Sequence, residues 1–348
     1  MAISSMKRRE FLKIAAVSAA MGKSGKDALS ILSNQLERDS LFHVSGELVA
    51  TRAFNWIASN RLYFNPFCWG VLPKEWCQTA LAELSLLCYH LRGRKEFRDD
   101  SRVEKCLDTI EQVYRKPLFH EYIFRGDRRA FGGHLGIWIT LGHRNIETVI
   151  SRESLQQIID VGNVIYAERL PFRLLELRYF LDFGGFKHNM PSEADIFSRT
   201  FLDQDFDVVS MMDSDIYSIT HTIFYLTDFG GRVSPLLSGE REESLLELLE
   251  FLLGMEIHAR NWDLVAELIL SYRCLRSHDS TLVKLGWKAL HLNQGQDGSI
   301  RDLTLSRKEL KRFKDKASRK KYEFRRRYHS TLTTVMAGFL GKKRSHAG

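Results

Sequence analysis

The sequence predicts an all-α fold, and three observations lead to this class. Apolar residues recur at spacings of three and four through most of the 348 residues. Only 6 prolines occur, which favours long helices. No segment has the alternation of a convincing strand. We therefore expect a single domain of about twelve helices, arranged as an α/α toroid or as a curved helical array.

The helices of the first half are placed by their apolar spacing. We expect one helix over residues 71–92 and a second over residues 146–170. Pro171 suits a first helical turn, so a third helix should cover 172–183 and stop at Gly184 and Gly185. The fragment 137–140 is β-like, although neighbouring glycines weaken that interpretation.

Capping residues and turns place the remaining helices. Ser192 should begin a helix, and Asp213 or Ser214 should cap the next one, which runs to Phe229. Residues 244–260 and 262–276 should form an antiparallel pair. Three further helices are expected over 281–293, 306–327 and 328–340.

A short turn between two of these helices favours the toroid. Gln294-x-x-Asp297-Gly298-Ser299 follows an amphipathic helix. It resembles the Gln-x-x-Asp-Gly-Ser/Trp turn of terpene cyclases and related α/α-barrel repeats. In that turn the Gln and Asp side chains connect helix ends, so we expect a structural role here.

Charge divides the chain into a body and two basic ends. Residues 1–26 and 307–348 are rich in Lys and Arg, and the residues between carry an acidic excess. We expect a basic segment at 1–26, one helical domain at 27–340 and a basic tail at 341–348. Lys7 to Lys13 resembles a twin-arginine signal, so export is the alternative to a cytoplasmic location.

Several classes of protein are excluded. The sequence contains no run of about 18 apolar residues, so no transmembrane segment is expected. Its 5 cysteines form no Cys-x-x-Cys pair, which speaks against a disulfide scaffold or zinc site. Asp213, Asp215, His221 and Asp228 fit no known metal-ligand spacing, so we expect no metal and no cofactor.

The strongest candidate for chemistry is a polar stripe on the helix that begins near Asp213. Asp213, Tyr217, His221 and Tyr225 recur every four residues and therefore share one face. Ile216, Ile219, Ile223 and Leu226 make the opposite face apolar. A histidine with a carboxylate and a tyrosine in reach is a general acid/base set, although a buried hydrogen-bonded network would have the same pattern.

The roles follow from this pattern and from a second polar cluster near the C-terminus. We assign His221 as base, Tyr225 or Tyr217 as acid, and Asp215 or Asp228 as the group that orients the imidazole. His329 is a second proton carrier, because the last helix of a toroid can approach the middle helices. Thr220, Tyr328 and Arg173 are candidate substrate-binding residues.

These residues resemble a protein family. Residues 215–230 read Asp-x-Tyr-x-x-Thr-His-x-x-Phe-Tyr-x-Thr-Asp-Phe-Gly, and 328–331 read Tyr-His-x-Thr. Together with 168–173, they resemble an uncharacterised bacterial family of all-helical proteins, over about residues 45–340. The resemblance implies a frequent setting in secondary-metabolite gene clusters and no established reaction.

Two functions from different classes are compatible with the sequence. The first is a tailoring enzyme of lyase, epimerase or cyclisation type, acting on a small molecule or peptide in a toroid cavity. The second is a non-catalytic binding protein. Its groove and basic segment 307–327 would hold an anionic partner: a peptide, a carrier protein or nucleic acid. The oligomeric state stays open.

Overall fold

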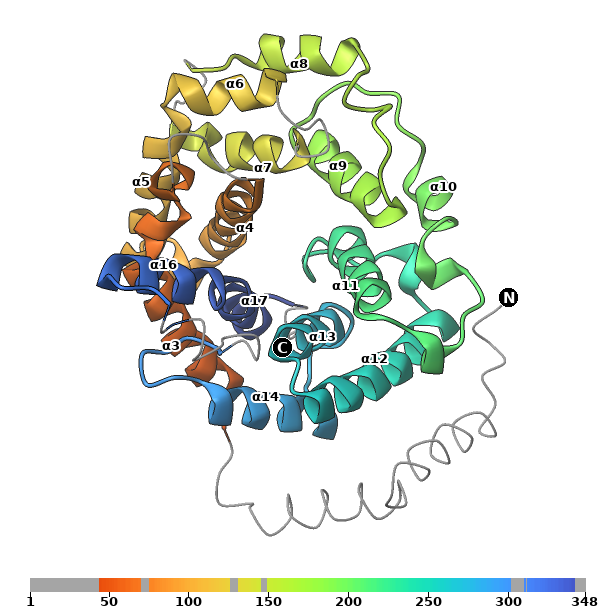
Figure 1. The fold of residues 1–348 in the computed structure, drawn as a ribbon. Helices are drawn as coiled ribbons and strands as arrows, with labels where there is room; N and C mark the ends of the chain where they lie inside the picture. The colour runs from red at the N-terminus through yellow and green to blue at the C-terminus, as the bar shows by residue number, and fades with distance from the viewer. Residues whose placement is uncertain are drawn as a thin grey trace.

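Six helices form the inner wall of a ring in the computed structural model (Figure 1), which describes residues 44–69, 75–125, 131–144, 149–301, 310 and 312–341. Each inner helix packs against the next, and the last packs against the first. The described part of the chain therefore has the closed toroid arrangement. The inner helices are α4 (Glu75–Arg92), α7 (Phe131–Leu141), α9 (Pro171–Phe183), α11 (Asp213–Thr227), α13 (Trp262–Leu275) and α17 (Tyr328–Phe339).

The other helices cover the outside of this ring and alternate with the inner ones along the chain (Figure 1). The outer helix α3 packs on α17, α5 on α4, α10 on α9, and α12 and α14 on α13. The outer helices are α3 (Gly46–Ser59), α5 (Ser101–Tyr114), α6 (Pro117–Arg125), α8 (Arg152–Asp160), α10 (Glu193–Phe197), α12 (Glu240–Ala259), α14 (Thr281–Asn293) and α16 (Lys316–Arg325).

Short 3-10 turns join several of these helices. They are η2 (Arg61–Phe64), η3 (Pro66–Trp69), η4 (Lys95–Phe97), η6 (Gly142–Arg144), η8 (Phe201–Asp203), η9 (Val208–Ser210) and η10 (Pro235–Leu237). The described residues contain no strand, only an isolated bridge between Gln294 and Ile300. The β-like fragment 137–140 is part of α7. The expected all-α class is confirmed.

Local sequence signals predicted the ends of several helices to within about one residue. Pro171 is the first residue of α9, and Ser192 caps α10 in a capping box with Asp195. The pair α12 and α13 turns at Arg260 and Asn261, and α14 has the expected bounds. These helices are the ones with clear start or stop residues.

Two expected helices are shorter than predicted. Within the described part of 146–170, only 152–160 is helical, because Gly162 takes a positive φ of 80° and the backbone leaves the helical conformation although the apolar spacing continues. In the basic segment, α16 begins only at Lys316, where the Asp315 carboxylate accepts a hydrogen bond from the Ser318 amide. Residues 302–309 and 311 lie outside the described residues.

The ends of α11 also differ from expectation. Neither Asp213 nor Ser214 caps the helix; the N-cap is Met212, and its amide donates to the Asp215 carboxylate at 2.9 Å. The helix ends at Thr227 instead of Phe229, because Asp228 and Phe229 both adopt left-handed conformations with φ of 49° and 52°. The chain thereby leaves the helical path, and Phe229 packs back against Phe224 and against the His90 ring of α4.

The Gln-x-x-Asp-Gly-Ser turn connects three helices. The Gln294 amide donates to the Val49 carbonyl of α3 at 2.9 Å and to the Gly298 carbonyl at 2.8 Å. Asp297 faces Arg327, the N-cap of α17, at 3.3 Å. The turn therefore holds α14, α3 and α17 together, the structural role that its sequence indicated.

Buried aliphatic and aromatic side chains fill the space between the two layers of helices. All five cysteines are free thiols, and Cys68 alone is not fully buried. No helix among the described residues has the length and apolar character needed to cross a bilayer. The twin-arginine-like segment lies outside the described residues.

Candidate functional site

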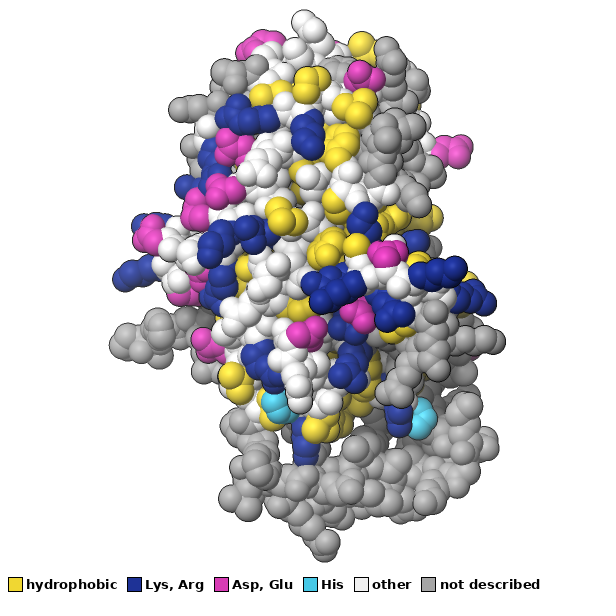
Figure 2. Space-filling model, turned by 60° about the vertical axis from the view of Figure 1, so that its left-hand side comes forward, with side chains coloured by type: hydrophobic (Ala, Val, Ile, Leu, Met, Phe, Trp, Pro, Cys, Tyr) yellow, Lys and Arg dark blue, Asp and Glu magenta, His cyan; other side chains and the backbone are white. Residues whose placement is uncertain are grey.

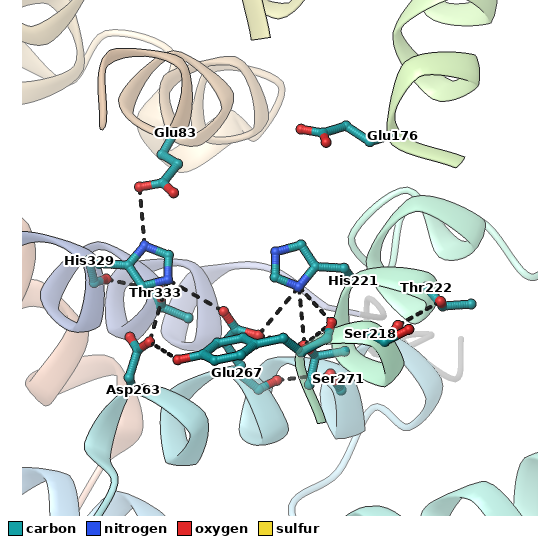
Figure 3. Close-up of polar contacts among 12 residues, drawn as sticks. Glu83, Glu176, Ser218, His221, Thr222, Asp263, Glu267, Ser271, His329 and Thr333 are labelled. Atoms are coloured by element: carbon teal, nitrogen blue, oxygen red, sulfur yellow. Dashed lines mark hydrogen bonds and ion pairs between the residues drawn. The ribbon is translucent and has the colours of Figure 1, made fainter. Parts of the chain in front are cut away.

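The polar face of α11 turns toward the centre of the ring. Ile216, Ile219, Ile223 and Leu226 are buried on the opposite side, as their spacing predicted. This packing leaves His221 facing α13 and α17 (Figure 3), and the Tyr217 hydroxyl donates to Asp263 of α13. Because the helix is anchored by four buried apolar side chains, the orientation of its polar face is well defined.

The tautomer of His221 follows from its hydrogen bonds. Its Nδ1 lies 2.8 Å from the backbone carbonyl oxygen of Tyr217, one turn earlier. A carbonyl can only accept, so Nδ1 carries a proton, and in the neutral imidazole Nε2 then offers a lone pair. Nε2 has no hydrogen-bond partner among the described residues and points toward the space between Glu83 and Glu176 (Figure 3).

Two carboxylates of α13, neither of them predicted from the sequence, lie beside the two histidines. Glu267 Oε2 accepts a hydrogen bond from the Thr220 hydroxyl and lies 3.6 Å from His221 Nδ1. Asp263 Oδ2 accepts a hydrogen bond of 2.6 Å from the Tyr217 hydroxyl. Their spacing of four residues, inside an apolar helix, was a signal that could have been used.

His329 joins this group from α17. Its Nε2 lies 3.5 Å from Asp263 Oδ2 and 3.5 Å from Glu267 Oε1, and its Nδ1 lies 3.1 Å from Glu83 Oε2 on α4. His221 and His329 thus contact the two oxygens of one carboxylate, Glu267. The ring brings together the two histidines, as a closed toroid would allow.

The electrostatics of the site reflect this crowding. Burial alone would lower the pKa of His329, but Asp263, Glu83 and Glu267 raise it well above the usual value. Burial opposes the ionisation of Glu267, yet His221 and His329 hold its pKa below normal. Burial, together with Glu267, raises the pKa of Asp263. Glu267 is 2% exposed and His329 33%, so solvent reaches one side of the cluster.

The two tyrosines of the stripe are neutral hydrogen-bond donors. Burial raises the pKa of Tyr217, and Asp263 and Glu267 raise it further. Burial and the nearby Glu176 likewise raise the pKa of Tyr225, which is 5% exposed. Tyr217 therefore orients Asp263, whereas Tyr225 sits deeper, against the ring of Tyr179.

Arg173 and Thr220 lie at the site, while Tyr328 lies beside it. Arg173, on α9, forms an ion pair of 2.8 Å with Glu176, whose side chain faces the same space as Glu83 (Figure 3). Thr220 is fully buried and bonded to Glu267. Tyr328 stacks on Phe324 with ring centroids 5.5 Å apart, in an aromatic cluster next to the polar site.

Asp215 and Asp228 occupy other places. Asp215 closes the first turn of α11 on the Met212 amide. Asp228, beyond the other end of the helix, accepts a 2.8 Å hydrogen bond from the Tyr179 hydroxyl. It lines a cavity of about 380 Å³ at the C-terminal ends of α4 and α11, with His90 and Phe229. Neither carboxylate contacts His221 among the described contacts, so Glu267 takes the position that the sequence analysis gave to them.

Part of the basic segment is bound to the chain itself. Lys321 donates to the Cys68 carbonyl, Arg325 lies over the ring of Trp76, and Arg327 faces Asp297. On the face that contains α3, α5 and α16, Lys and Arg side chains alternate with acidic ones (Figure 2). The described charges therefore form a mixed surface on this face and not an uninterrupted basic patch.

The comparisons with known proteins place the chain in one family. The family described as "Domain of unknown function (DUF6895)" matches residues 50–339. The matched range contains the whole ring from α4 to α17 and every residue of the candidate site. Neither the curated proteins nor the solved structures give a match. Since the match covers most of its length, the chain belongs to the DUF6895 family.

Proposed function

We propose that the protein is a tailoring enzyme that performs acid/base chemistry, of lyase, epimerase or cyclisation type, on a small molecule or peptide held within the helical ring. The observation that carries this proposal is the geometry of His221. Its Nδ1 proton is held by the Tyr217 carbonyl, so in the neutral imidazole the Nε2 lone pair is directed toward Glu83 and Glu176 (Figure 3), and 18% of the side chain is exposed. A base must be presented to its substrate in this way.

The surroundings of His221 support the same role. Glu267 lies beneath the imidazole, where its negative charge would stabilise the imidazolium formed when Nε2 takes a proton. His329 faces the same space from α17, opposite His221 (Figure 3). Two polar groups on opposite sides of one space are what removal and return of a proton require.

Replacement of His221 by Asn tests the proposal. Asn can donate to the Tyr217 carbonyl but has no basic nitrogen, so we expect the fold to persist and the reaction to stop. The small-molecule products of a producing host carrying the parent would be compared with those of a host carrying His221→Asn. Melting temperatures of both proteins would be measured in parallel.

His258→Asn provides the matched control, because this histidine is exposed on the outer helix α12. It should leave both the products and the melting temperature as in the parent. Unchanged products in His221→Asn would contradict the proposal. A drop of several degrees with little soluble protein would instead identify the stripe as a core network, and the role of His221 as base would be abandoned.

A further inference from the structure

The spacing around His329 Nε2 is unusual for a hydrogen bond. Two carboxylate oxygens, from Asp263 and Glu267, lie at the same distance of 3.5 Å from this nitrogen. A charge-assisted hydrogen bond would draw one of them to about 2.8 Å. Two ligand atoms bound at about 2.1 Å to one tetrahedral ion lie about 3.4 Å apart. The observed spacing therefore fits atoms that surround an ion.

The partners of these three residues have the arrangement found behind metal ligands. His329 Nδ1 lies 3.1 Å from Glu83 Oε2; if Nδ1 keeps its proton on Glu83, a metal ion that displaces the Nε2 proton would find a lone pair there. The Tyr217 hydroxyl orients Asp263, and the Thr220 hydroxyl orients Glu267. Each of the three side chains is thus oriented by a neighbouring residue. These contacts leave His329 Nε2 and at least one lone pair on each carboxylate available to a metal ion.

The charge of the cluster is the third observation. Glu83, Asp263 and Glu267 bring three carboxylates to two imidazoles, and no Lys or Arg forms an ion pair with them among the described residues. Asp263 Oδ1 is buried and lacks a hydrogen bond of normal geometry. Buried and partly buried carboxylates in excess of their partners are stabilised by a bound cation.

We propose that Asp263, Glu267 and His329 bind one divalent transition-metal ion, with Glu83 as the second-shell partner of His329. The candidate ligand atoms of the three residues all lie within 4.8 Å of one another. One imidazole with two carboxylates suits Zn²⁺, Mn²⁺ or Fe²⁺, whereas Ca²⁺ and Mg²⁺ prefer oxygen ligands alone. This inference goes beyond the proposed function, because binding of the ion does not require His221 to act as a base. While its Nε2 binds the ion, however, His329 would not also carry a proton on that nitrogen.

The test uses the full chain after treatment with a chelator. Co²⁺ is added, because its visible absorption reports the geometry of its ligands, and Zn²⁺ binding is measured by calorimetry. We expect one ion per chain. Asp263→Asn and Glu267→Gln should each weaken binding by at least about 100-fold, and Glu83→Gln by about 10- to 100-fold.

Two controls make the outcome specific. His188→Gln removes an imidazole that lies 2.9 Å from the single carboxylate of Asp182 at the end of α9, and it should bind as the parent does. His221→Asn should also keep the parent's affinity within a few fold. The experiments can therefore contradict the proposed metal site without contradicting the proposed role of His221 as base, and the reverse.

The absence of a saturable Co²⁺ spectrum in the parent would overturn the proposal, whatever the variants do. Binding that is equally strong in the parent, Asp263→Asn and Glu267→Gln would overturn it too, because the ion would then sit elsewhere. If circular dichroism shows that Asp263→Asn and Glu267→Gln do not fold, the comparison of ion binding between the parent and Glu83→Gln tests the proposal. Glu83 is 25% exposed, so its substitution should be tolerated.

Discussion

His329 on α17 contacts Glu83 on α4, with Nδ1 3.1 Å from Oε2. These two helices are the last and the first of the inner wall, so the contact spans the point at which the ring closes (Figure 1). The same imidazole contacts Asp263 and Glu267 through its other nitrogen. One side chain therefore takes part both in the contact that closes the ring and in the candidate site.

The first prediction concerns this contact. Glu83→Gln removes a partly buried charge from the pair, and in metal-free protein we expect the free energy of unfolding at pH 7 to fall by about 1 kcal/mol. Chemical denaturation measures the change. Glu47→Gln, on the exposed face of α3, should change stability by less than about 0.5 kcal/mol. Equal effects would mean that the ring closes without help from this pair.

Thr220 provides the second prediction. Its hydroxyl donates to Glu267, so Thr220→Val leaves a buried carboxylate without one of its donors at almost constant volume. We expect a loss of about 1–3 kcal/mol in the free energy of unfolding. Thr222→Val is the matched control, because Thr222 is equally buried but donates to the Ser218 carbonyl of its own helix.

Denaturation of both variants at one pH makes the comparison. The control should lose less than about 1 kcal/mol, since the Ser218 carbonyl keeps its backbone hydrogen bond. If Thr222→Val costs as much as Thr220→Val, the effect belongs to the helix and not to Glu267.

The fold could be predicted from sequence where the signals are local. Pro171, Ser192 and the turn at Asn261 mark helix ends by their own conformational preferences, so α9, α10 and the α12–α13 pair were placed closely. The helix over 146–170 was predicted too long because its apolar spacing continues past Gly162, where the backbone turns to a positive φ. Spacing alone does not reveal such a break.

The site could be predicted only in part, for a different reason. The stripe of Tyr217 and His221 is visible because four-residue spacing is a property of one helix. Its partners lie on α4 and α13, and only the closure of the ring brings them into contact. Glu267 in particular reads as an ordinary helix residue, although it is 2% exposed. The carboxylate beside a buried histidine was therefore assigned to Asp215 or Asp228, on the same helix.

The third prediction concerns the stability of the fold in acid. Burial lowers the pKa of His134, on α7, to about 4, and its Nδ1 has no hydrogen-bond partner among the described residues. The nearby His120 is also buried, and its pKa is lowered too. In the unfolded chain, a histidine titrates near its ordinary value of about 6.5.

The sign follows from proton binding. Between pH of about 6.5 and about 4, the unfolded chain holds the proton that native His134 lacks, so the free energy of unfolding falls as the pH falls through this window. The ceiling for His134 is about 3 kcal/mol. His134→Leu should flatten the dependence without a loss at pH 7.5, as measured by denaturation across the window. An unchanged slope in this variant would show that other groups control the response to acid.

The fourth prediction tests the turn that connects α14 to α3 and α17. Gly298 has a φ of 92°, and a Cβ at this position would lie 2.2 Å from the Arg52 carbonyl oxygen. Gly298→Ala therefore combines an unfavourable backbone conformation with a steric clash, and we expect it to lower the free energy of unfolding by at least about 2 kcal/mol.

Gly254→Ala is the control, because a Cβ there meets nothing within 4 Å in the interior of α12. Since alanine is the better helix former, this control should gain about 0.5–1 kcal/mol. Opposite signs for the two glycines, measured by thermal and chemical denaturation, would establish that the conformation of this turn contributes to the stability of the fold. A Gly298→Ala variant as stable as the parent would show that the ring does not depend on the backbone conformation of this turn.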